Sequence, residues 1–248
     1  MKKKKVIGIS IVVIALIIGC VCFNMFSQSK TDKGIAYLQA QEKLKVEDIQ
    51  EELNKKKQAE LQSAVEQGNL DVFSLVDDFV FYGDSRVMGY YVYNLLDANR
   101  IFAGSGNTLY NVSDWDEQLR SLNPSNVFIS YGVNDMGSDL DNDYEGGYEG
   151  LAKVQMNHIL EIVPNASIYL CSIIPCSPEV TKEKPYWAKY EDYNSKLQKA
   201  CNAVEACTYV DVTGLADGGN ANIYSGDGIH FSPSFYTDWL TAIVNKMD

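Results

Sequence analysis

The pattern of apolar and polar residues divides the chain into three parts. Residues 6–26 form an uncharged, mostly apolar stretch, long enough to cross a bilayer as a helix. Residues 31–69 are rich in Lys, Glu, Gln, Leu and Ala and contain no proline, which predicts a helix that ends near Gly68-Asn69. From residue 71 onward, short apolar runs alternate with amphipathic segments. We therefore predict a membrane anchor over 1–30, a helical stalk or linker over 31–70 and a globular domain over 71–248.

The globular part predicts a regular alternation of strands and helices. Its short apolar runs predict strands at 79–82, 100–103, 127–131, 167–174 and 208–212. Helical spacing predicts helices at 86–98, 112–122, 151–163, 186–204 and 233–246. Strands joined through helices of this length imply βαβ units. The predicted fold is α/β, with three α/β/α layers and a central, mostly parallel five-stranded sheet.

The N-terminal segment predicts a location outside the cytoplasmic membrane. Lys2 to Lys5 precede the apolar stretch, so the positive-inside rule leaves the N-terminus in the cytoplasm and the globular part outside. Ile17-Ile18-Gly19-Cys20 gives an alternative, a bacterial lipoprotein with a lipid on Cys20, and a cleaved signal peptide is a third. All three alternatives place the globular domain outside. The apolar positions of the stalk partly follow coiled-coil spacing, but Lys55 to Lys57 interrupt them, so a spacer is favoured over a weak dimer.

Charge sharpens this division and excludes some functions. The net charge is −12, of which residues 1–70 contribute +3 and residues 71–248 contribute −15. An acidic domain is unsuited to nucleic acid, because phosphate contacts need clustered Lys and Arg. With only two histidines, the chain has little room for a His-rich zinc site, and we expect no metal or cofactor. The acidic run at 139–148 lacks the full spacing of a calcium loop and is predicted to be a solvated loop.

Four short motifs lie at strand ends or before a helix, where active sites of parallel sheets form. Ser85, in Gly83-Asp84-Ser85, stands at the mouth of a helix, as a nucleophile could. The block 104–108 brings glycine amides, and Asn134 in 132–135 brings a side-chain amide that can bind an oxyanion. Asp227 lies three residues before His230, so its carboxylate can orient the imidazole that takes a serine proton.

Together, these motifs resemble the SGNH (GDSL-type) hydrolase family over residues 79–248. The resemblance rests on GDSxxxG, a glycine in the second block, GxND and DxxH. It implies a flavodoxin-like sheet, a catalytic triad of Ser85, His230 and Asp227, and an oxyanion hole. The hole would comprise the backbone N–H groups of Ser85 and Gly106 and the Asn134 side chain, with Gly104 as the alternative to Gly106.

Two residues depart from that family pattern. Arg86 stands where many lipolytic members have Leu or another apolar residue, and this charge argues against a purely lipidic substrate. Phe231, directly after the histidine, replaces the Pro or Leu that is common there.

The remaining notable side chains are predicted to be structural. His158 lies within a predicted helix and is not expected to be catalytic. Cys171, Cys176, Cys201 and Cys207 allow three disulfide pairings, none of which the sequence selects. The many tyrosines suit ordinary core packing, with sugar binding as the alternative.

The resemblance implies an extracytoplasmic serine esterase, with O-acetylated carbohydrate or cell-wall glycan as the leading substrate. The −15 charge of the domain favours a neutral ester over a polyanion. Alternatives within the family are an O-acetyltransferase, a lipase and a thioesterase. The alternative from another class is an inert surface binding or scaffold protein, against which the intact motifs argue.

Overall fold

The computed structural model describes residues 55–56, 59–61, 63–65, 67–216 and 223–247. The chain divides into two units, residues 1–59 and residues 60–248. The predicted anchor over 1–30 and most of the predicted stalk over 31–70 lie outside the described residues. Among the residues that are described, no helix combines the length and the apolar character needed to span a membrane.

One parallel sheet organises the second unit. Its strands are β1 (Phe79–Gly83), β2 (Ile101–Ala103), β3 (Asn126–Ser130), β4 (Ser167–Cys171) and β5 (Cys207–Val210), in the spatial order β2-β1-β3-β4-β5. Every neighbouring pair is parallel. This confirms the predicted α/β fold with a five-stranded parallel sheet.

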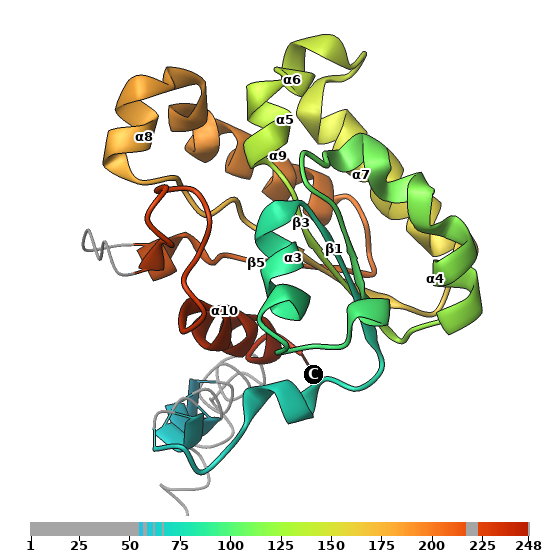
Figure 1. Cartoon of the computed structure of the whole chain (residues 1–248). Coiled ribbons are helices and arrows are strands. Elements are labelled where there is room, and N and C mark those ends of the chain that lie inside the picture. The colour runs from blue at the N-terminus through green and yellow to red at the C-terminus, as the bar shows by residue number, and fades with distance from the viewer. Residues whose placement is uncertain (1–54, 57–58, 62, 66, 217–222, 248) are drawn as a thin grey trace, which may run out of the picture. The chain divides into compact units, whose positions relative to one another are not determined.

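Helices cover both faces of the sheet (Figure 1). The α-helices are α3 (Ser85–Val92), α4 (Asp116–Leu122), α5 (Val133–Gly137), α6 (Leu140–Asp143), α7 (Gly147–Ile162), α8 (Pro178–Glu183), α9 (Tyr190–Asn202) and α10 (Phe235–Val244). The 3-10 helices are η1 (Val72–Leu75), η2 (Ala98–Arg100), η3 (Leu109–Trp115), η4 (Pro185–Lys189) and η5 (Thr213–Ala216). Helices α4, α7 and α9 pack on one face, and α3 and α10 pack on the other.

The strands read as continuous apolar runs because both of their faces are buried. Successive side chains of β1 point to opposite faces, so Val80 and Tyr82 join the core beneath α7 and α9. Phe79 and Phe81 join the core beneath α3 and α10, where Trp239 contributes the largest side chain. The sheet therefore separates two cores, and its carboxyl edge is left for the connecting loops.

Several predicted boundaries are wrong, and local backbone conformation explains the largest differences. The helix predicted over 86–98 ends at Val92, because Asn94 takes a left-handed conformation with φ 56°. The helix predicted over 112–122 is a 3-10 helix from Leu109 followed by α4. The short helices α5 and α8 were not predicted, since neither has enough residues to show a helical period.

The predicted acidic loop at 139–148 is mostly helical. It contains α6 and the first two residues of α7. Its carboxylates bind protein groups: Asp141 accepts from the Tyr148 amide at 2.9 Å and pairs with Lys196 at 2.7 Å. Asp139 pairs with Lys189 at 3.5 Å. These internal partners explain why acidic residues form helix here.

The structure resolves the cysteine pairings that the sequence left open. Cys201 and Cys207 form a disulfide that closes the connection from α9 to β5. Cys171 and Cys176 are free thiols, and both are buried.

The glycine at the end of the GDSxxxG motif is explained by close packing. Gly89 lies inside α3 against the ring of Tyr236, and a Cβ at this position would overlap the Tyr236 phenol. The same phenol donates a 2.8 Å hydrogen bond to the Arg86 carbonyl. The missing side chain therefore lets α10 approach the helix that begins at Ser85.

We expect Gly89→Ala to destabilise the domain by about 1–3 kcal/mol, because the added methyl group displaces Tyr236. Gly150→Ala is the matched control, since a Cβ there meets only Tyr144 and Gly150 also lies within a helix. The control should be neutral or slightly stabilising, as alanine is the better helix former. Urea denaturation of both variants measures the difference, and equal effects at the two positions would contradict this packing role of Gly89.

Candidate active site

The strand register brings three loops to one edge of the sheet. Gly83 at the end of β1 pairs with Ala103 of β2 on one side and with Ser130 of β3 on the other. The segments that follow these residues begin side by side, as is usual at the carboxyl edge of a parallel sheet. These segments carry Ser85, Gly106 and Asn134.

A buried carboxyl group shapes the turn between β1 and α3. Asp84 is the N-cap of α3, and its Oδ1 accepts from the Arg86 amide at 2.8 Å. Burial raises the pKa of Asp84, and the positive charge of Arg86 opposes that rise. Ser85 becomes the first residue of the helix, and it is half-exposed while both of its neighbours are buried.

Ser85, His230 and Asp227 form one hydrogen-bond chain. The Nε2 of His230 lies 2.9 Å from the Oγ of Ser85, although the two residues are 145 positions apart. The Nδ1 of His230 lies 2.6 Å from the Oδ2 of Asp227. The structure thus brings together the three residues that the sequence predicted as a triad.

The carboxylate of Asp227 remains ionised over a wide pH range. Partial burial disfavours its charge, but hydrogen bonds from the His230 side chain and from the amides of Ile229 and His230 outweigh burial and lower the pKa of Asp227 to about 2. Both amides donate to Oδ1 at 2.8 Å, while Oδ2 faces the imidazole. The carboxylate can therefore orient the ring and keep a proton on Nδ1.

The segment that carries Asp227 and His230 has no helix or strand. Each of the carbonyl groups of residues 228–231 instead accepts a hydrogen bond from a residue elsewhere in the chain. Ser177 N–H donates to the Gly228 carbonyl at 2.8 Å, and the Nε of Arg86 donates to the Ile229 carbonyl at 2.9 Å. Ser225 N–H donates to the His230 carbonyl at 2.8 Å, and the Tyr93 hydroxyl donates to the Phe231 carbonyl at 3.4 Å. Four donors from outside residues 227–231 thus hold this segment in place of the backbone hydrogen bonds that a helix or strand would supply.

Two of the predicted oxyanion residues, Gly106 and Asn134, are linked through Asn107. The side-chain amide of Asn134 donates to the Asn107 carbonyl at 2.9 Å, which leaves its second N–H free to donate elsewhere. Gly106 directly precedes Asn107 and has φ 79°, a conformation that other residues adopt only with strain. At Gly104, in contrast, a Cβ would meet the Asn107 side chain. The two glycines of the block thus differ. Gly106 is exposed and has a left-handed backbone conformation, whereas Gly104 allows the Asn107 side chain to pack closely against the backbone.

A second buried carboxyl group joins α5 to η3. Asp135 is fully buried, and its Oδ1 accepts from the Leu109 amide at 2.9 Å. Burial raises the pKa of Asp135 to about 7; the Leu109 amide opposes the rise, and the nearby Asp84 adds to it. This link and the bond between Asn134 and Asn107 fix the loop after β2 against the loop after β3.

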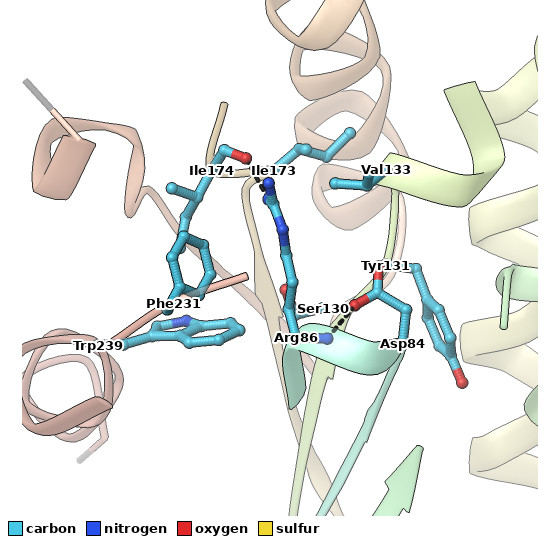
Figure 2. A pocket seen from close by; sticks show the side chains of 9 residues that line it. All are labelled: Asp84, Arg86, Ser130, Tyr131, Val133, Ile173, Ile174, Phe231 and Trp239. Atoms are coloured by element: carbon cyan, nitrogen blue, oxygen red, sulfur yellow. Dashed lines mark hydrogen bonds between the residues drawn. The ribbon is translucent and has the colours of Figure 1, made fainter. Parts of the chain in front are cut away.

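The prediction that the charge of Arg86 argues against a purely lipidic substrate is wrong. The Arg86 side chain is only 4% exposed and points inward from the turn, so it presents no charge to a substrate and does not disfavour a lipidic one. It lines a small pocket together with Asp84, Ser130 and Phe231 (Figure 2). The pocket lies behind the turn and is lined by both neighbours of Ser85 but not by Ser85 itself.

His158 takes no part in the hydrogen-bond chain of His230. Its Nε2 lies 2.8 Å from the Oδ1 of Asp116, so it joins α7 to the start of α4. Across the described ranges, no group of three or more His, Cys, Asp or Glu residues could hold a metal ion.

Comparison with known proteins gives the family and the fold. The model of the GDSL-like lipase/acylhydrolase family matches residues 81–237. No curated protein matches the sequence.

Solved structures of low sequence identity share the fold. A protein from Streptococcus pneumoniae, solved under the provisional name of a platelet activating factor, is 20% identical, with a TM-score of 0.54 over 80% of this chain and 96% of its own. The acetyl xylan esterase AlAXEase is 15% identical, with a TM-score of 0.51 over 68% and 99%. A catalytic mutant of an acetylxylan esterase from Geobacillus stearothermophilus is 18% identical, with a TM-score of 0.51 over 68% and 92%.

The raised pKa of Asp135 predicts a pH-dependent effect of Asp135→Asn. The ordinary aspartate pKa is 3.8, and the folded value is about 7. Between these two pH values the unfolded chain releases a proton that the folded chain retains, so the wild type loses stability as pH rises. The asparagine variant lacks this loss and can still accept from Leu109. Its stability relative to wild type should therefore increase from pH 4 to pH 7.

Asp211→Asn serves as a control of opposite sign. Although burial acts against it, hydrogen bonds from Thr213 and Ser172 lower the pKa of Asp211. Its carboxylate therefore stabilises the fold above the unfolded pKa and loses this effect as pH falls. Urea denaturation from pH 3 to pH 7 measures both variants. If the difference in the free energy of unfolding between Asp135→Asn and wild type is constant over this pH range, the raised pKa of Asp135 is refuted.

Proposed function

The chain belongs to the GDSL-like lipase/acylhydrolase family, and from this premise we propose that it is a serine esterase that removes O-acetyl groups from carbohydrate or cell-wall glycan outside the cytoplasm. Membership makes the protein a hydrolase of this family. The proposal adds the nucleophile, the substrate and the location.

The single observation that carries the serine mechanism is the chain of hydrogen bonds from Asp227 through His230 to Ser85. Nε2 of the imidazole is 2.9 Å from the serine oxygen, within reach for direct proton transfer. Asp227 is ionised at neutral pH and lies 2.6 Å from the opposite ring nitrogen. An inert binding protein would have no need for this arrangement, in which each member orients the next.

In the proposed reaction, His230 takes the hydroxyl proton as the Ser85 oxygen attacks the ester carbonyl carbon. The negative charge on the former carbonyl oxygen is stabilised by the backbone N–H groups of Ser85 and Gly106 and by the Asn134 side chain. His230 then gives its proton to the departing sugar oxygen, which leaves an acetyl group on Ser85. A water molecule, deprotonated by His230, attacks this ester; the bond to the Ser85 oxygen breaks, His230 returns the proton to that oxygen, and acetate leaves.

Two exposed tyrosines, on elements that adjoin the loops of the site, support a carbohydrate substrate. Tyr110 and Tyr186 are 42% and 37% exposed, respectively. Tyr110 follows the glycine block in η3. Tyr186 adjoins Trp187, whose indole donates to the carbonyl of Val133 at 2.8 Å, next to Asn134. Exposed tyrosine rings can stack on sugar rings and bind their hydroxyls. Two of the structural neighbours are acetylxylan esterases, which agrees with this choice.

The proposed location rests on the sequence and on one covalent bond. Lys2 to Lys5 and the apolar residues 6–26 fit a membrane anchor with the catalytic domain outside, and a lipid on Cys20 is the alternative. The disulfide between Cys201 and Cys207 supports an oxidising compartment. In this arrangement, the segment 31–70 links the membrane to the domain.

Substitution of the two histidines should give opposite results. We expect His230→Ala and Ser85→Ala each to lower kcat on an activated acetyl ester by a factor on the order of 10⁴, because the nucleophile and its base act as a unit. His158→Ala removes only the contact with Asp116 and should leave kcat within about twofold of wild type. Initial rates with an aryl acetate measure all three. Wild-type activity no higher than that of Ser85→Ala would refute the serine mechanism.

The substrate class is tested with natural esters. Acetate released from acetylated xylan and from acetylated wall glycan is compared with fatty acid released from a long-chain aryl ester, with Ser85→Ala as the blank. We expect kcat/KM to be highest for an acetylated glycan. Preference for the long-chain ester would overturn the carbohydrate assignment, and transfer of acetyl to an added glycan in place of acetate release would make the enzyme a transferase.

A further inference from the structure

The residue after the nucleophile is a buried cation. Arg86 is 4% exposed, and within the described ranges no carboxylate forms an ion pair with its guanidinium. Burial of a charge is costly unless other groups replace its hydration. An apolar side chain would fill the space between α3 and the β4 end without this cost, so the contacts of the guanidinium are expected to serve a purpose beyond packing.

Those contacts surround His230. The Nε of Arg86 donates to the Ile229 carbonyl at 2.9 Å, directly before the histidine. The guanidinium carbon lies 4.8 Å from the centre of the Phe231 ring, directly after it. Arg86 and Phe231 are the two residues that depart from the family pattern in the sequence, and the structure places one over the other (Figure 2).

The far end of the guanidinium is fixed to the core. One terminal nitrogen donates to the Ile174 carbonyl, and the other lies 3.2 Å from the sulfur of Cys176. Both acceptors follow β4 and are buried. The planar fork therefore has a defined orientation, which a flexible ammonium group at this position would not have.

We propose that Arg86 is a positioning residue for His230: it joins the Ile229 carbonyl before the histidine and the Phe231 ring after it to the helix that begins with the nucleophile. Because Arg86 is covalently next to Ser85, this contact sets the distance between the base and the serine oxygen. The segment 227–231 needs such a contact, since it has no helix or strand of its own and only Phe231 joins an isolated bridge, with Tyr224 outside the segment. The inference rests on the proposed serine mechanism.

Arg86→Met tests the proposal, because it keeps most of the side-chain length and removes every donor. We expect kcat on an aryl acetate to fall about 10²-fold with KM nearly unchanged, as a small displacement of a catalytic group has this effect. Arg86→Lys should recover part of the loss, since its ammonium can remain over Phe231 but cannot reach all three acceptors. A proton NMR spectrum without substrate gives a second readout, the downfield resonance of the proton between His230 and Asp227. We expect this signal to weaken or broaden in Arg86→Met.

Arg100→Met is the matched control for loss of a guanidinium. Arg100 also donates to a backbone carbonyl, that of Phe79 at 3.2 Å, but at the opposite end of β1. We expect the Arg100→Met substitution to lower only the stability of the protein and to leave kcat and the downfield resonance unchanged. Thermal melting of each variant sets the assay temperature below its unfolding transition, and Arg86→Lys carries both readouts if Arg86→Met does not fold.

The outcomes separate this inference from the proposed function. If Arg86→Met, or Arg86→Lys in its place, has the kcat of the wild type, the positioning role is overturned. A lowered kcat with an unchanged resonance would overturn it as well. If the wild type itself shows no hydrolysis that depends on Ser85, the proposed function fails. The NMR comparison would still report whether Arg86 fixes His230.

Discussion

The candidate site depends on one contact, the 2.9 Å approach of the His230 imidazole to the Ser85 hydroxyl. The serine belongs to the first strand-to-helix turn, whereas the histidine lies in an irregular segment before the last helix. A rigid sheet holds the serine, because β1 lies between β2 and β3 and both of its faces are buried. The histidine has no such support and relies on hydrogen bonds to its neighbours' carbonyl groups. Packing of α10 against α3 at Gly89 and the contacts of Arg86 therefore act on the same distance.

Much of this arrangement could be predicted from the sequence, for physical reasons that are specific to each element. The strands are short apolar runs because both faces of the sheet are covered, and a run such as Val127 to Ile129 is too apolar for an exposed loop and too short for a helix. The triad residues lie in motifs whose spacing reflects local chemistry. Asp227 and His230 are three residues apart, and this spacing lets one carboxylate accept two amides of its own turn and also face the ring.

Other features could not be predicted, because they depend on partners distant in the chain. The acidic residues at 139–143 look like a solvated loop until Lys196, on another helix, is placed beside Asp141. The inward direction of the Arg86 side chain could not be predicted either. A charge next to a nucleophile suggests a contact with substrate, but the acceptors of the Arg86 guanidinium lie 88 to 143 positions away in the chain. Helix boundaries such as the end of α3 depend on single left-handed residues, which hydrophobic periodicity does not reveal.

The inward direction of Arg86 also changes what the electrostatics of the domain imply for a substrate. The globular region carries −15, and its one arginine beside the nucleophile is buried against neutral acceptors. Arg86 therefore offers no exposed charge to an anionic group of a substrate. The two carboxyl groups near the nucleophile, Asp84 and Asp135, are buried, and burial raises the pKa of each. In the proposed mechanism, a neutral ester would therefore develop its transient negative charge beside N–H dipoles, which can stabilise a single oxyanion without a fixed positive charge.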